Sequence, residues 1–174
     1  LSAVVKYHLT ERMRQCINDA MDVHGGKGIC MGPSNYLGRA YQSVPISITV
    51  EGANILTRNM MIFGQGAIRC HPFALEEIQS IQSNELKCFD ARCFGHIGLV
   101  FSNTTRATVL GWTRSLLGSS PVDGPAAPYF RRLDRMSAAY SVCAEVSMMT
   151  LGASLKFREK LTGRLADGLA WLFL

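Results

Sequence analysis

Several features are scarce in this sequence of 174 residues, and each scarcity excludes a class of protein. Charged residues make up 18% of the chain and apolar residues 48%, a balance that excludes a disordered tail. The alternation of apolar and polar residues that is typical of strands is rare, whereas helix formers and methionines are plentiful. We therefore predict an all-α fold, built as a packed helical bundle.

These residues also contain no long apolar run, no signal-peptide pattern and no pair of cysteines at CxxC spacing. The longest uncharged stretch, Cys93–Thr105, is too short to span a bilayer and is bounded by Arg92 and Arg106. No CxxC pair occurs among the six cysteines, so we expect a reduced, cytoplasmic protein. The chain begins inside a helical pattern and stops in the apolar run GLAWLFL, which suggests a piece of something longer.

Metal and nucleophile patterns are weak. Cys88, Cys93 and His96 could share one helix face, but without a second ligand pair we favour small buried side chains over a metal site. The four histidines are isolated in the sequence: His8, His24, His71 and His96. We predict no bound metal and see no Ser/His/Asp or Cys/His arrangement.

The basic residues are dispersed, and the net charge is +5. Arg131, Arg132 and Arg135 cluster at a predicted helix start without an aromatic platform or a known binding module. This pattern favours a solvated face, and we predict no nucleic-acid partner.

Apolar spacing predicts helices in the first half of the chain. Residues 2–24 carry an apolar residue about every fourth position, and the helix should end at HGGKG, where Gly25 or Gly26 can cap it. A glycine-rich loop is expected over residues 27–45. A second helix should start near Glu51 and run through Arg69. Three of its side chains are expected to face inward: Ile55, Met60 and Phe63.

Helices are also predicted in the second half. Pro72 suits the first turn of a helix over HPFALEEIQSIQ, and residues 85–117 form a longer candidate. GSSPVDGPAAP, residues 118–128, is the clearest break in the sequence, and a long helix rich in small residues is expected over residues 129–157.

Two local stretches each allow two interpretations. Glu51, in TVEGANILTR, could be a carboxylate at a helix N-terminus, or a catalytic base partly desolvated by its apolar neighbours Ile46, Ile48 and Val50. HGGKG could be a simple helix cap, or a place where the backbone approaches a ligand. The residues alone favour the structural interpretation of both.

Three stretches in order resemble the C-terminal helical domain of acyl-CoA dehydrogenases: INDAMDVHGGKGI, LGRAY and ISITVEGANILTR. The resemblance covers residues 1–70 and is closest to the large bacterial long-chain enzymes. Residues 71–174 look like the helical C-terminal extension of those enzymes.

The resemblance implies an FAD-dependent oxidation of fatty acyl-CoA to trans-2-enoyl-CoA in fatty-acid β-oxidation. Glu51 would be the base that abstracts the α-proton, and Gly52 would lie against the thioester end of the substrate. The family's FAD contacts, some of them to the flavin of a neighbouring subunit, fall here on Asp22, Val23, His24, Gly25, Gly26, Ala53, Asn54 and Ile55.

The resemblance also implies a homo-oligomer that passes electrons to an electron-transferring flavoprotein or similar acceptor. Peripheral contact with a membrane would be compatible with it. At some positions this chain differs from the residue that is common in the family. One example is Ala53, where the family often has threonine. The family's N-terminal helical domain and β-domain are absent from these residues, so we expect the fragment alone to be inactive. The alternative is a non-catalytic helical module for oligomerisation, or for docking to a membrane face or an electron-transfer partner.

Overall fold

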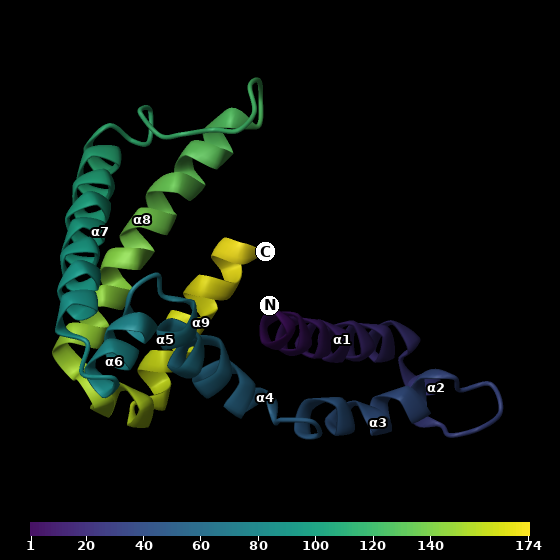
Figure 1. Ribbon diagram of the computed structural model, residues 1–174. Helices are drawn as coiled ribbons and strands as arrows, with labels where there is room; N and C mark the ends of the chain where they lie inside the picture. Colours follow the sequence, from purple (N-terminus) through teal and green to yellow (C-terminus); the bar gives the residue numbers. More distant parts are fainter.

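The computed structural model describes all residues, 1–174, and consists of helices joined by turns and loops (Figure 1). The predicted all-α class is confirmed. The elements in chain order are α1 (Ser2–His24), α2 (Gly26–Ile29), α3 (Leu37–Thr49), α4 (Asn54–Leu56), the π-helix η1 (Thr57–Gln65), α5 (Gly66–Cys70), α6 (Ala74–Gln82), α7 (Leu86–Trp112), α8 (Ala127–Leu151), the 3₁₀-helix η2 (Gly152–Phe157) and α9 (Glu159–Phe173). No helix combines the length and hydropathy needed to cross a bilayer.

The end of α1 confirms the predicted cap. Gly25 has φ 57°, in the left-handed region, and its N–H donates to the carbonyl oxygens of Met21 and Asp22. A residue without a Cβ adopts this conformation at little cost, which is why the helix stops at this glycine.

The predicted loop over residues 27–45 is wrong, because this segment contains α2 and most of α3. Asn35 is buried, and its Oδ1 accepts hydrogen bonds from the backbone N–H groups of Leu37 and Gly38 at 3.1 and 2.7 Å. A Cβ on Gly38 would collide with the sulfur of Met31. This glycine therefore allows close packing at the start of α3, and it does not mark a loop.

The second predicted helix exists, but it begins at Asn54 and its middle is π-helical. Phe63 is buried, with 2% of its surface exposed, as predicted. Met60 is exposed and Ile55 is 66% exposed, so their predicted inward orientation is wrong. The prediction assumed α-helical periodicity from Ile55 to Phe63. Met60 lies in η1, whose wider i to i+5 turns place side chains on other faces than an α-helix does, whereas Ile55 precedes η1 in the short helix α4.

The helices predicted in the second half are confirmed with shifted ends. α7 ends at Trp112, and α8 ends at Leu151, where η2 replaces its last predicted turns. α7 and α8 pack against each other as a long hairpin, with the predicted proline-rich break in the loop at its tip (Figure 1).

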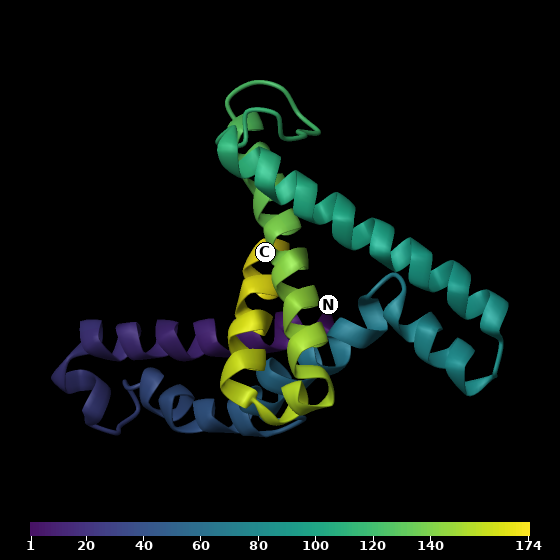
Figure 2. The ribbon, with the colours of Figure 1, turned by 90° about the vertical axis from the view of Figure 1, so that its left-hand side faces the viewer.

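The hydrophobic core joins the two ends of the chain. α9 packs against η1 and lies beside α8 (Figure 2). The Arg58 guanidinium of η1 makes a two-point ion pair with the Asp167 carboxylate of α9, with Nε 2.7 Å from Oδ1. The buried core consists of Val4, Ile62, Phe63, Leu155, Leu165, Ala166 and Ala170. These core residues come from both sides of the domain boundary predicted at residue 70. The boundary itself stays a prediction.

Gly163 allows α9 to approach η1 closely. A Cβ at this position would lie 2.5 Å from Oδ1 of the buried Asn59 and 2.9 Å from Nη1 of Arg58. We expect Gly163→Ala to lower the free energy of unfolding by about 1–3 kcal/mol, as overpacking does. Thermal or urea unfolding measures this change.

Gly98 provides the matched control for Gly163. It lies within α7, and a Cβ there would have no neighbour within 4 Å. Gly98→Ala should raise the free energy of unfolding by about 0.5–1 kcal/mol through helix propensity alone. Equal effects of the two substitutions would contradict the close contact between α9 and η1.

Candidate active site

Glu51 and Gly52 form the turn between α3 and α4, with both residues in the left-handed region. Glu51 has φ 54° and Gly52 has φ 91°. For a residue with a side chain this conformation is uncommon, and such strain concentrates at functional sites. The turn directs the chain from the end of α3 into η1 and leaves Glu51 exposed.

The structure contradicts the capping interpretation of Glu51. α4 starts only at Asn54, its N-cap is Ala53, and no side chain makes a capping hydrogen bond to it. The expected desolvation is also absent within this chain, because Ile46, Val50 and Glu51 itself are exposed. Ile48 is half-buried, but the two apolar residues with exposed side chains leave the carboxylate open to solvent.

Lys6 of α1 holds the turn in place. Its Nζ donates to the carbonyl oxygen of Gly52 at 2.8 Å and to Oδ1 of Asn54 at 2.6 Å. Thr57 adds a hydrogen bond of 3.3 Å from its Oγ1 to the same Gly52 oxygen. The backbone directly after Glu51 is therefore fixed from two sides.

Asn54 is the centre of this network, with 4% of its surface exposed. Its Nδ2 donates to Oγ1 of Thr10 at 2.9 Å and to Oε1 of Glu11 at 2.8 Å. The Asn54 amide is thus occupied by α1, and its predicted contact to a cofactor stays a prediction. Lys6, Thr10 and Glu11 were not predicted as site residues, although their helical spacing on one polar face of α1 was a usable signal.

The predicted cofactor residues fall into two separate groups. Ala53, Asn54 and Ile55 follow Glu51 directly, whereas residues 22–26 lie at the far end of α1. Asp22 follows Lys6 by sixteen positions along α1, which is a rise on the order of 24 Å. One chain therefore does not bring the Gly-Gly stretch to the Glu51 turn.

The Gly-Gly stretch is itself accessible. Val23 is 88% exposed, and a Cβ on Gly25 or Gly26 would have no neighbour within 4 Å. A shallow groove borders the stretch, lined by Asn18, Met21, Asp22, Gly25, Ile29 and Tyr41. The ring of His24 stacks edge-on against Tyr36 at a centroid distance of 5.1 Å. Open backbone next to a partly apolar groove suits a flat cofactor, so these residues fit the contact that the resemblance implies.

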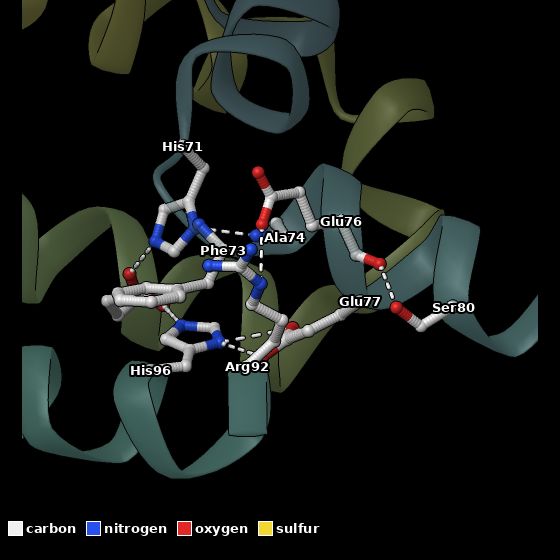
Figure 3. A network of polar contacts seen from close by, with 9 residues as sticks. His71, Phe73, Ala74, Glu76, Glu77, Ser80, Arg92 and His96 are labelled. Atoms are coloured by element: carbon white, nitrogen blue, oxygen red, sulfur yellow. Dashed lines mark hydrogen bonds and ion pairs between the residues drawn. The ribbon is translucent and has the colours of Figure 1, made fainter. Parts of the chain in front are cut away.

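A second polar cluster lies where α6, α7 and α8 meet (Figure 3). It unites His71, His96 and Glu145, whose potential ligand atoms all lie within 4.8 Å of one another. The two histidines are isolated in the sequence but are neighbours in the structure, because the turn before α6 and the helix α7 both pack at Glu145 of α8. Cys88 and Cys93 do not belong to this group.

Two family models match the chain. Residues 1–63 match the model described as acyl-CoA dehydrogenase, C-terminal domain. Residues 68–174 match the model described as acyl-CoA dehydrogenase, C-terminal, bacterial type. No solved structure matches the chain.

Proposed function

Because the chain belongs to the acyl-CoA dehydrogenase family, as its sequence motifs predict, we propose that it forms the C-terminal part of an FAD-dependent enzyme of the bacterial cytoplasm. This enzyme would oxidise fatty acyl-CoA to trans-2-enoyl-CoA in fatty-acid β-oxidation. Glu51 would be its catalytic base. The observation that carries the proposal is the Glu51-Gly52 turn, which is strained, anchored to α1 and free of any capping role.

The chemistry assigns distinct tasks to the residues of the turn. The Glu51 carboxylate would accept the α-proton of the thioester, and Gly52 would let the substrate approach the backbone. Lys6 and Asn54 would hold the turn, so that the carboxylate keeps its position while the proton moves. Bound FAD would accept the hydride that leaves the β-carbon.

The separation of the two predicted cofactor groups supports a homo-oligomer. The Glu51 turn and residues 22–26 lie near opposite ends of α1. A chain with this geometry would serve one flavin with residues 53–55 and a neighbouring subunit's flavin with residues 22–26. Electrons would then pass to an electron-transferring flavoprotein or a similar acceptor.

Anaerobic titration of the full-length protein with a long-chain acyl-CoA tests this function. Bleaching of the flavin absorbance band supports the proposed oxidation. Bound flavin that is not reduced by acyl-CoA contradicts the substrate class, and a purified full-length protein without flavin contradicts the proposal as a whole.

A second role for residues 71–174 rests on the outer face of α7. Phe94, Ile97 and Phe101 follow helical spacing on this face and are exposed, and Trp112 near the end of α7 is 86% exposed. Apolar side chains grouped in this way mark interaction surfaces. We propose that this face serves oligomerisation or docking to a membrane face or electron-transfer partner.

Point substitutions test the docking role better than truncation, because removal of α9 would uncover the core residues of η1. We expect Phe94→Gln combined with Phe101→Gln to change the oligomer size or the membrane association, with turnover of soluble acyl-CoA unchanged. Analytical ultracentrifugation and vesicle sedimentation measure these properties. Asp90→Asn, an exposed change on the same helix, is the control, and wild-type behaviour of the double variant would exclude this role.

A further inference from the structure

The buried carboxylate of Glu145 links three helices. Glu145 belongs to α8 and has 3% of its surface exposed. Its Oε1 lies 2.6 Å from Nε2 of His71, in the turn before α6, and its Oε2 lies 3.1 Å from Nε2 of His96, on α7 (Figure 3). A buried carboxylate is costly unless it is paired and hydrogen-bonded, so the protonation states of these two histidines decide how this junction is held.

The hydrogen bonds of His71 assign its tautomer. Its Nδ1 accepts the backbone N–H of Ala74 at 2.9 Å and that of Phe73 at 3.2 Å. This nitrogen therefore carries no proton, and the ring is neutral with its proton on Nε2, directed at Glu145. His71 in this way also satisfies backbone donors at the N-terminus of α6.

His96 has the opposite pattern, because both of its ring nitrogens face carboxylates. Nδ1 lies 2.9 Å from Oε1 of Glu77 on α6, and Nε2 faces Glu145. Carboxylates accept and do not donate, so both nitrogens must carry a proton. Burial lowers the pKa of His96, but hydrogen bonds to Glu145 and Glu77 and the charges of both carboxylates outweigh it and raise the pKa above its usual 6.5.

We propose that His96 is a proton-operated latch: its imidazolium joins α6 to α8 through α7, and loss of one proton loosens this junction. With the proton, the cation bridges two carboxylates that come from different helices. Without it, one ring nitrogen presents a lone pair to a carboxylate oxygen. The buried Glu145 then also loses the cation that balances its charge.

The hydrogen bonds favour a proton over a metal ion at this place. The ligand atoms are close enough for a metal, but a metal on Nε2 of a neutral His71 would require a proton on Nδ1. That proton would point at the N–H groups of Phe73 and Ala74 and remove their acceptor. Glu77 could bind a metal ion or accept a hydrogen bond from a protonated His96. The hydrogen bonds of His71 therefore distinguish the two possibilities.

The other groups around His96 do not replace its charge. The ring of His71 lies 4.6 Å away between centroids, and the ring of Phe73 stacks on His96 at 6.0 Å. Arg92, one turn earlier on α7, is paired with Glu76 at 2.7 Å. Since the pKa of His96 is raised in the folded protein, the latch is strongest below about pH 6.5 and weakens as the pH rises through the folded pKa.

Hydrogen exchange of the full-length protein tests the latch. After correction for intrinsic exchange, amides of α6 and of the adjoining part of α7 should exchange several-fold faster at pH 8.5 than at pH 6.0. His96→Gln should remove this pH dependence. Glu77→Gln, which keeps a hydrogen-bonding group but removes one charge, should shift the transition to lower pH and is the second variant if His96→Gln does not fold.

Glu76→Gln is the matched control, because it breaks the neighbouring exposed ion pair between the same two helices and should leave the pH dependence intact. Equal protection of the wild type at both pH values would overturn the latch. So would an unchanged transition in both His96→Gln and Glu77→Gln. Zinc that slows exchange at these amides in the wild type, but not in His96→Gln, would overturn it in favour of a metal site.

Discussion

Replacement of Glu51 with glutamine in the full-length enzyme is expected to slow flavin reduction by acyl-CoA about 10²–10⁴-fold, the typical contribution of a positioned general base. The amide has nearly the same shape as the carboxylate but cannot accept the α-proton. Flavin content and stability should not change, because Glu51 is exposed and caps no helix. Anaerobic stopped-flow absorbance of the flavin band measures the rate.

A substitution at Lys6, which positions the turn, distinguishes loss of the catalytic base from displacement of the turn that carries it. Lys6→Met removes the donor to the Gly52 carbonyl and to Asn54, so it should reduce the rate by less than Glu51→Gln does. The Lys6 variant should also keep the pH dependence of the base, which the Glu51 variant should lose. Normal turnover of Glu51→Gln would refute its assignment as the base, even if the flavin and the substrate were established.

Replacement of Glu145 with alanine is expected to lower the free energy of unfolding by about 3–5 kcal/mol at pH 6, the cost of breaking a buried ion pair. The substitution leaves a charged His96 without its most buried partner and the Nε2–H of His71 without an acceptor. It also opens a cavity where α8 meets the other two helices. Urea unfolding followed by circular dichroism measures the loss.

Glu76→Ala is the control for this measurement. Glu76 pairs with Arg92 between α6 and α7, but about half of each side chain is exposed. Its removal should change the free energy of unfolding by no more than about 1 kcal/mol, because solvent screens an exposed pair. If Glu145→Ala lowered the free energy of unfolding as little as Glu76→Ala does, the buried junction would not stabilise the fold.

The features that could be predicted from the sequence are those with local causes. The cap at Gly25, the break over residues 118–128 and the main helices depend on the residues within a few positions of each other. α3 was missed because its preceding glycines and the internal Pro45 look like a loop, whereas Asn35 and the packing of Met31 on Gly38 stabilise a helix start.

The features that could not be predicted depend on contacts between distant residues. His71 and Glu145 are 74 positions apart, and Lys6 and Gly52 are 46 apart, so no local pattern pairs them. η1 likewise packs against α9, about a hundred residues later in the chain, and no local pattern predicts this contact. For Glu51, the neighbouring residues alone favoured a role as a helix-capping carboxylate. Only the ordered motifs of the family indicated a catalytic base.

The packing of α9 on η1 has a consequence for how the chain folds during synthesis. Ile62 and Phe63 emerge from the ribosome about a hundred residues before Leu165, Ala166 and Ala170, which cover them. Until α9 is made, a nascent chain must keep this apolar surface away from other chains, and contacts this distant in sequence form slowly. A translational stop shortly before residue 159 should therefore yield an aggregating product, even though every residue of the Glu51 turn and of the histidine cluster is already present.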